Sequence, residues 1–292
     1  MKKILAAILC LLCLTAAVLP LEAKKKPKPP MPQEEFLNIC ARGKLSQVGK
    51  GVKRGADLNA SDKKGLTPLI CAAREQDDPD VIVYLIKKGA QVNRPNDQGL
   101  TPVMAAAMYN PTVRVMKALL QYGADPRKGD ITGSSALIGA ARLNRNPAVL
   151  ETLLKDAPEL VNVPSRSGLT PLMATASNRG GAMTALLLDH GADDEAKDRA
   201  GRTALSHAAE KGNTEALRVL LTRGDAVVNL ADRQGMTPLM YAAASGSDPR
   251  ALELLLDHGA KTGRKDTKGR GALWHAKRNK ALAGAAVLER LR

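Results

Sequence analysis

Aromatic side chains are scarce in this sequence of 292 residues, in which Phe, Trp and Tyr together make up 2%. Proteins that bind single-stranded nucleic acid without sequence preference stack the bases on aromatic rings. So few rings argue against nucleic acid as a partner, even though the formal net charge is +15. The 44% of hydrophobic residues must be mainly Leu, Ala, Val, Ile and Met. These residues suit close-packed helices better than a β-sandwich.

Cysteine is also rare, with four residues in the chain. Cys10 and Cys13 lie in the apolar N-terminal run, which leaves Cys40 and Cys71 in the remainder. Two cysteines do not make a disulfide framework. They can pair if their Cα atoms lie within about 7 Å of each other. Otherwise they pack as small apolar residues between helices, and the sequence leaves both alternatives open.

No apolar run is long enough to be a standard membrane-spanning helix. The run Ile4–Leu19 has 16 residues and follows Lys2 and Lys3, whereas a span needs roughly 20. Small residues then offer cleavage points after Ala17 or Ala23. This order of charged, apolar and small residues is typical of a secretory signal, and an uncleaved anchor is the alternative. We predict a signal peptide at residues 1–23 and export, to the periplasm or to the extracellular medium.

A linker rich in Lys and Pro follows at residues 24–33, where four Lys and four Pro occur within nine residues. Proline keeps such a segment extended and the charges keep it solvated. It is read either as a spacer or as a polybasic tether that contacts an anionic membrane surface. Residues 1–23 carry a net charge of +1, which leaves +14 on the rest of the chain. That surplus favours acidic partners.

The dominant feature of the remaining sequence is a repeat of 33 to 35 residues. Most units begin with Thr-Pro-Leu, continue with a pair of small residues, and end after a second apolar run in a glycine turn. Proline suits the first position of a helix, and glycine suits the position after its end. The matching segments begin at Thr67, Thr101, Ser135, Thr170, Thr203, Thr237 and Gly271.

This pattern resembles the ankyrin-repeat family over residues 34–292. The resemblance implies an all-α repeat solenoid of about eight helix–turn–helix units with short β-turn fingers. The units start near residues 34, 67, 101, 135, 170, 203, 237 and 271, and the first and last are degenerate caps. We expect one monomeric domain over residues 34–292, ending in a basic helix at residues 279–292.

The sequence departs from the family pattern at the position after Thr-Pro-Leu, where ankyrin repeats usually carry a His that ties neighbouring turns together. We therefore predict that an apolar ladder replaces this polar one, which leaves the rigidity of the fingers in question. The residues at this position are Ile70, Met104, Ile138, Met173, Ser206, Met240 and Trp274.

Ankyrin repeats typically bind partners along their concave face, through finger tips and exposed positions of the inner helices. The residues there predict an apolar strip in the first half of the array, with basic residues beside it. Such a surface suits a protein partner, although each leucine alone could simply pack against the next finger. The strip comprises Leu66, Leu100, Met108, Tyr109, Leu143 and Leu169, and the basic residues are Lys63, Lys64, Arg142, Arg166, Arg199, Arg202 and Arg233.

The sequence contains no nucleophile elbow, phosphate-binding loop or paired-carboxylate motif. His207 and His275 occupy equivalent sites two repeats apart, too far apart to share a metal ion. We therefore expect no enzymatic activity, cofactor or metal. Two functions stay open: an exported adaptor that binds an endogenous protein, and a secreted effector or membrane-surface factor that acts through the basic arm.

Overall fold

The computed structural model describes residues 29–178, 181–223 and 227–292. The chain divides into two compact units, residues 1–30 and residues 31–292. The predicted signal peptide and residues 24–28 of the predicted linker lie outside the described residues. The description that follows concerns the second unit taken by itself.

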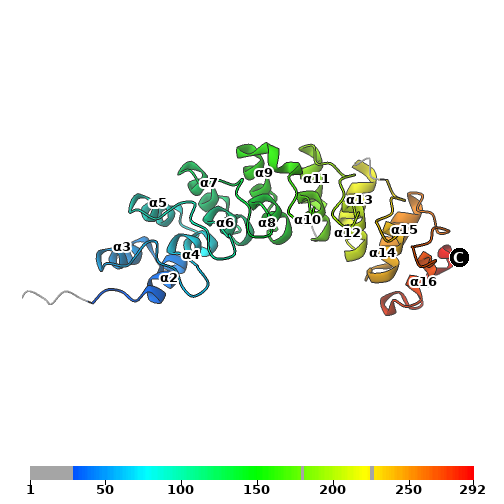
Figure 1. Ribbon diagram of the computed structural model, residues 1–292, viewed down its shortest axis with the longest axis horizontal. Helices are drawn as coiled ribbons and strands as arrows, with labels where there is room; N and C mark the ends of the chain where they lie inside the picture. The colour runs from blue at the N-terminus through cyan, green and yellow to red at the C-terminus, as the bar shows by residue number, and fades with distance from the viewer. Residues whose placement is uncertain (1–28, 179–180, 224–226) are drawn as a thin grey trace, which may run out of the picture. The chain divides into compact units, whose positions relative to one another are not determined.

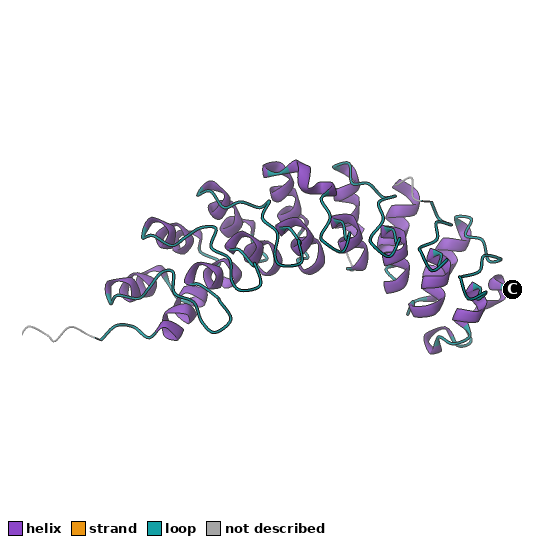
Figure 2. Cartoon of the chain, viewed as in Figure 1, coloured by secondary structure: helices purple, strands orange, loops and turns teal. Residues whose placement is uncertain are grey.

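The described residues form helices joined by loops, and none of them is in a strand (Figure 2). None of the helices found in the described ranges is long and apolar enough to cross a membrane. The predicted all-α repeat stack is thereby confirmed. The helices are α2 (Gln33–Arg42), α3 (Leu45–Lys53), α4 (Pro68–Glu75), α5 (Pro79–Lys87), α6 (Pro102–Tyr109), α7 (Val113–Gln121), α8 (Ala136–Leu143), α9 (Pro147–Asp156), η1 (Pro158–Asn162), α10 (Pro171–Ser177), α11 (Gly181–Asp189), α12 (Ala204–Lys211), α13 (Thr214–Arg223), α14 (Pro238–Ser245), α15 (Pro249–Asp257), α16 (Ala272–Ala276), η2 (Lys280–Leu282) and η3 (Ala286–Leu291).

The helices are arranged in two rows (Figure 1). The even-numbered helices α2 to α16 each contact the next even-numbered helix and make up the inner row. The odd-numbered helices α3 to α15 form the outer row in the same way, and each packs against the inner helix of its own repeat. The inner row lies on the concave side of the stack (Figure 1). The concave face therefore consists of inner helices and the fingers that precede them.

The Thr-Pro-Leu segments form the starts of the inner helices. Thr67 caps α4 by accepting a hydrogen bond from the backbone amide of Ile70 at 3.3 Å, and Pro68 is the first helical residue. Because proline lacks an amide hydrogen, this position costs no hydrogen bond. The cap satisfies one of the amides that a helix start leaves without a partner. The same hydroxyl cap recurs at Thr101, Ser135, Thr170, Thr203 and Thr237.

The fingers stack closely on one another. In the finger before α4, the Asp62 carboxylate accepts hydrogen bonds from the amides of Lys64 and Leu66 at 2.8 and 2.9 Å. Gly65 in this turn has a φ of +73°, and a Cβ atom there would lie 2.7 Å from the backbone nitrogen of Asp97 in the next finger. Only glycine fits this position, because it tolerates the positive φ and leaves room for the next turn.

The repeats are joined by an apolar ladder at the position after Thr-Pro-Leu and by polar ladders at other positions. The residues after Thr-Pro-Leu are buried as predicted, apart from the exposed Trp274, and Ser206 among them is polar. A separate ladder of side-chain amides lies at the ends of the inner helices. Asn144, for example, donates to the carbonyls of Ala107 and Asn110 in the preceding repeat, both at 2.9 Å. Equivalent pairs of hydrogen bonds to carbonyls of the preceding repeat are donated by the side chains of Gln76, Asn110, Asn213 and Asn279.

The outer loops carry a second amide ladder. The Asn93 side chain donates to the carbonyl of Gly123 at 2.8 Å and accepts from the amide of Asp125 at 2.8 Å. The fingers are also tied directly, for example by a 2.9 Å bond from the Arg166 amide to the Thr132 carbonyl. These bonds hold the fingers in place without the histidine ladder. The same pair of side-chain bonds is made by Asn59, Asn162 and Asn229.

The C-terminal cap differs from the predicted basic helix at residues 279–292. Two short 3₁₀ segments, η2 and η3, occupy this range instead. Gly284 lies between them with a φ of +77°, which is not a helical conformation. Leu282, Val287 and Leu291 are buried and close the end of the hydrophobic core. The two 3₁₀ segments, and not a continuous helix, therefore place these three side chains over the last repeat.

Candidate partner-binding face

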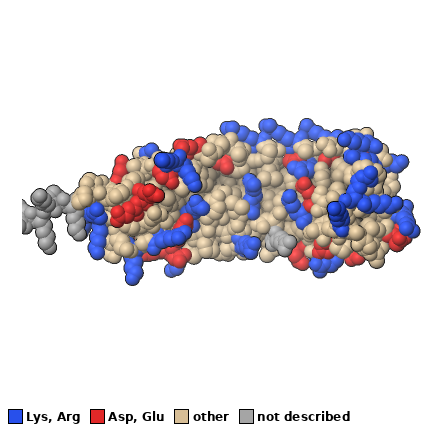
Figure 3. Space-filling model, turned by 90° about the horizontal axis from the view of Figure 1, so that it is seen from below, with Lys and Arg blue, Asp and Glu red and all other residues tan. Residues whose placement is uncertain are grey.

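The middle of the concave face carries two exposed apolar side chains. Tyr109 at the end of α6 is 44% exposed, and Leu143 at the end of α8 is 48% exposed. They occupy consecutive repeats, and α6 contacts α8 directly. Figure 3, which shows the stack from the concave side, has few charged side chains in its middle region. Exposed apolar side chains on adjacent helices of one face make this region a candidate for contact with another protein.

Met108 lies between these two repeats. A Cβ atom added to Gly139 in α8 would lie 2.6 Å from the Met108 Cγ atom, so the missing side chain of Gly139 is what makes room for Met108. Both residues line a small cleft of about 30 Å³ together with Arg142 and Leu143. Four predicted neighbours are thus brought together, since Met108, Arg142 and Leu143 join Tyr109 on the ends of two adjacent inner helices.

A cation–π contact holds Tyr109. The guanidinium carbon of Arg74, in helix α4 of the preceding repeat, lies 4.7 Å from the centre of the Tyr109 ring. Such a contact contributes roughly 0.5–1 kcal/mol at an exposed site. Arg74 was not among the predicted site residues.

The three leucines of the predicted strip are less available. Leu66, Leu100 and Leu169 are half-buried and pack against the hydrophobic core. Leu169 also packs against the small cluster of Ile138, Ala141 and Ala174. Much of their surface therefore stabilises the fingers, and only the remainder faces solvent. Tyr109 and Leu143 are the members of the strip that a partner can reach most fully.

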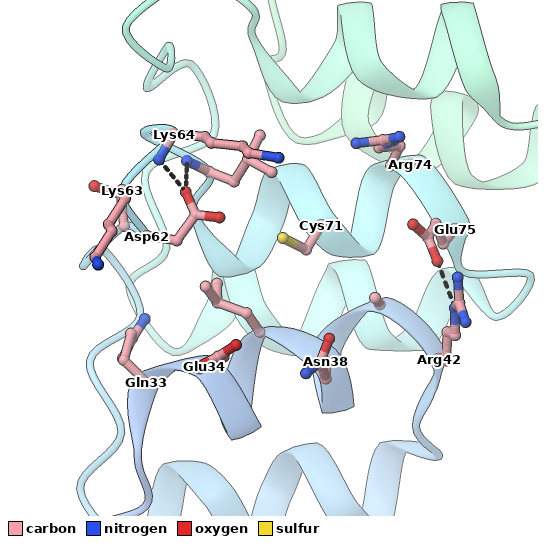
Figure 4. A pocket seen from close by; sticks show the side chains of 14 residues that line it. Gln33, Glu34, Asn38, Arg42, Asp62, Lys63, Lys64, Cys71, Arg74 and Glu75 are labelled. Atoms are coloured by element: carbon pink, nitrogen blue, oxygen red, sulfur yellow. Dashed lines mark hydrogen bonds and ion pairs between the residues drawn. The ribbon is translucent and has the colours of Figure 1, made fainter.

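A larger cleft of about 690 Å³ opens at the N-terminal end of the concave face (Figure 4). Its floor is formed by Leu37, Ala41, Leu66 and Cys71, and its rim carries charges of both signs. An ion pair of 2.6 Å joins Arg42 to Glu75 at one side. Lys63 and Lys64 lie at the other side, on the finger, and both are exposed.

The two cysteines near this cleft are free thiols. Burial, with a smaller effect of the Cys71 charge, raises the pKa of Cys40 to about 12. Burial and the nearby Asp62 and Glu75 carboxylates raise the pKa of Cys71 to about 11. Both thiols are therefore neutral near pH 7. A neutral thiol is a poor nucleophile and a poor metal ligand.

The basic residues predicted beside the strip fall into two groups. Lys63, Lys64, Arg142, Arg166, Arg199 and Arg233 are exposed. Arg202 differs, because its guanidinium pairs with Asp198 at 3.0 Å and with Glu210 at 3.2 Å. It belongs to the framework of its own finger. The exposed members can attract an acidic partner, whereas Arg202 is already neutralised.

Two histidines support the later fingers. His207 bonds to Asp198 at 3.0 Å, and His275 bonds to Asp266 at 3.2 Å. Burial, assisted by the charge of Arg202, lowers the pKa of His207. Burial alone would raise the pKa of Asp266, but hydrogen bonds from Arg270 and backbone amides outweigh it and hold that pKa well below its usual range. In the described part of the chain, no three His, Cys, Asp or Glu residues gather as a metal site would require.

A stack of paired helices with a concave face and projecting fingers defines a class of repeat proteins that bind other macromolecules. The family model described as ankyrin repeats (3 copies) matches the chain over four overlapping ranges, residues 37–130, 113–198, 137–232 and 182–266. This chain belongs to the ankyrin-repeat family. Such repeats typically serve as modules for protein–protein interaction.

One solved structure extends the comparison. It is the complex of the predatory endopeptidase Bd0816 from Bdellovibrio bacteriovorus with the immunity protein Bd3460. A chain of this complex is 29% identical to the present one, with a TM-score of 0.56. The match covers 64% of this chain and 97% of that chain. The matched chain comes from a structure of two proteins in complex.

Proposed function

We propose that this protein is an exported binding module that holds one protein partner against its concave face. The observation that carries the proposal is the exposure of Tyr109 and Leu143 on adjacent inner helices, with Arg74 and Arg142 beside them. Aromatic and arginine side chains are the residues that dominate binding energy at protein interfaces. The role proposed is binding and not catalysis.

The partner we propose is an enzyme that the stack covers and thereby inhibits. The support is the similarity to a chain from a complex of an endopeptidase and its immunity protein. An elongated concave surface suits this task because it can cover the typical 800 Å² or so of one partner in a specific interface. Export is supported by the charged, apolar and small-residue order of residues 1–23, with the periplasm as the proposed location.

Affinity capture from the exported fraction tests this proposal. The full chain with a C-terminal tag is compared with a variant carrying Tyr109→Ser and Leu143→Ser. We expect the parent to retain a protein that the variant loses, with the affinity reduced by at least about 2 kcal/mol. Circular dichroism must show that the variant is as helical as the parent.

The matched control carries Tyr122→Ser and Val163→Ser. These side chains are 37% and 41% exposed, but they lie outside the inner helices. The control should keep the partner. The concave face is not the binding surface if the control loses the partner as well, or if both variants keep it.

The alternative is a secreted effector or membrane-surface factor that acts through the Lys/Pro-rich residues 24–33. Cell fractionation separates it from the main proposal. Retention in the periplasm supports binding to an endogenous enzyme. Release of the protein into the medium supports the alternative. So does recovery of the protein in the membrane fraction, if replacing the four lysines with Gln abolishes that recovery.

A further inference from the structure

The positive charge of the protein is concentrated at its C-terminal end. Residues 259–292 contain ten Lys and Arg residues against two acidic ones, a net charge of +8. Residues 29–258 contain 28 basic and 26 acidic residues, a net charge of only +2. In Figure 3, Lys and Arg side chains gather at this end of the stack. The charge surplus is therefore a local feature of the last repeat and its cap.

An arginine–tryptophan cluster lies within this basic end. Trp274 in α16 is 36% exposed. The guanidinium carbon of Arg270 lies 4.6 Å from the centre of a Trp274 ring, and that of Arg278 lies 3.8 Å away. The His275 ring packs edge-on against Trp274 at 5.0 Å. Trp274 thus lies at the centre of a cluster with Arg270, Arg278 and His275.

The two arginines of this cluster differ in what they bind. Arg270 is paired with the buried Asp266 at 2.7 Å. Arg278 is exposed, and its guanidinium forms no ion pair with any acidic side chain in the described residues. Because Trp274 restrains it, Arg278 presents N–H groups to solvent in a defined orientation. A positioned guanidinium is suited to bind a carboxylate through two hydrogen bonds. Exposed Lys277 and Lys280 are close to it in the sequence.

We infer that the C-terminal end of the concave face, centred on Arg278 and Trp274, binds an acidic segment of the protein partner. This inference rests on the proposed function and adds a second contact to it. The inner row of helices runs without interruption from α8, which bears Leu143, to α16. A partner lying along that row reaches the basic end, and its acidic residues complement the local charge.

Two other anionic partners fit the cluster less well. A nucleic-acid base needs a free aromatic face, and two guanidinium groups already lie over the Trp274 ring. A membrane-anchoring tryptophan needs to insert its ring among the lipids, whereas this ring is only about one-third exposed. Carboxylates on a polypeptide need neither a free aromatic face nor an inserted ring, because they bind the N–H edges of the guanidinium groups.

The test uses the full chain and a fluorescein-labelled peptide of ten glutamates, with binding followed by fluorescence anisotropy at low salt. Arg278→Gln should weaken binding roughly tenfold, as expected for loss of a charge-assisted hydrogen-bond pair. Trp274→Leu should weaken binding in the same direction, because it removes the restraint on Arg278. Lys261→Gln removes the same charge from an exposed position outside the cluster and should change the affinity less than about twofold. Equal losses in Arg278→Gln and Lys261→Gln overturn the inference, since the peptide would then sense net charge only.

Two further probes decide between partner classes. The first probe is vesicles containing phosphatidylserine, and the second is a thymidine oligonucleotide of ten residues. If either binds through Arg278 more tightly than the peptide does, an acidic polypeptide is the wrong partner class. The Tyr109→Ser/Leu143→Ser variant should keep full peptide binding while losing the captured protein. Peptide binding that depends on Arg278 in a chain that captures no protein would contradict the proposed function and leave the anion site standing.

Discussion

Gly51 lies so close to Phe36 that a Cβ atom at this position would be 2.6 Å from the Phe36 ring. Phe36 is fully buried in the first repeat, so its ring can move away only by displacing buried neighbours. We expect Gly51→Ala to destabilise the protein by about 1–3 kcal/mol through overpacking. Urea denaturation followed by circular dichroism measures this change.

Gly49 provides the control, because it lies in the same helix and has no such neighbour. The nearest atom to an added Cβ is the Tyr84 hydroxyl at 3.5 Å, which is ordinary contact. Gly49→Ala should stabilise the protein by up to about 1 kcal/mol, since alanine favours helix. A loss of stability at both positions would show that helix α3 as a whole resists substitution.

The amide ladder of the inner helices should be important for stability. Asn144→Ala removes three side-chain hydrogen bonds: one from the Asn146 amide, and two to the carbonyls of Ala107 and Asn110, which lose these partners in a buried site. We expect a loss of about 2–3 kcal/mol in the free energy of unfolding. Gln121→Ala, at an exposed position of α7, should change it by less than about 0.5 kcal/mol. Similar effects of the two substitutions would mean that the ladder contributes no more than a surface residue does.

The His207–Asp198 pair should make stability depend on pH. Burial lowers the pKa of His207 in the folded state below its usual value of 6.5. As the pH falls below 6.5, the unfolded chain takes up this proton more readily than the folded one, so stability is full above 6.5 and falls as the pH decreases. His207→Gln should reduce the stability difference measured between pH 7.5 and 5.5. His258→Gln, at an exposed position, serves as the matched control. A parent protein that becomes more stable on acidification would contradict the prediction.

The free thiols should react slowly in the folded protein. With pKa values raised to about 12 and 11, Cys40 and Cys71 carry almost no thiolate at pH 7.5. We expect alkylation by iodoacetamide to be much slower than in urea, with Cys71 modified first because it is only half-buried. Mass spectrometry identifies the modified residue. If neither cysteine reacts even in urea until a reductant is added, the two form a disulfide.

The candidate face shows where sequence reasoning reached its limit. The spacing of the repeat placed Met108, Tyr109, Arg142 and Leu143 on one face, and the structure brings them together. The sequence did not reveal that Arg74 stacks on Tyr109, since both residues merely follow alanine pairs. It also did not distinguish Arg202, which is paired, from the exposed Arg199 three residues earlier. Ion pairs and stacking contacts depend on distances between side chains, which the repeat spacing in the sequence does not specify.

The sequence by itself determined the fold, because a 34-residue period with Thr-Pro-Leu starts and glycine stops specifies helix pairs locally. Each signal acts over a few residues, so no long-range contact was needed to read it. Only the tertiary structure decided which polar residues join the repeats and how the ends are closed. Asn144 finds its partners 34 and 37 residues away, and the last residues form 3₁₀ segments because they must cover an exposed core. These outcomes depend on how neighbouring layers pack, and therefore appear only once the stack is assembled.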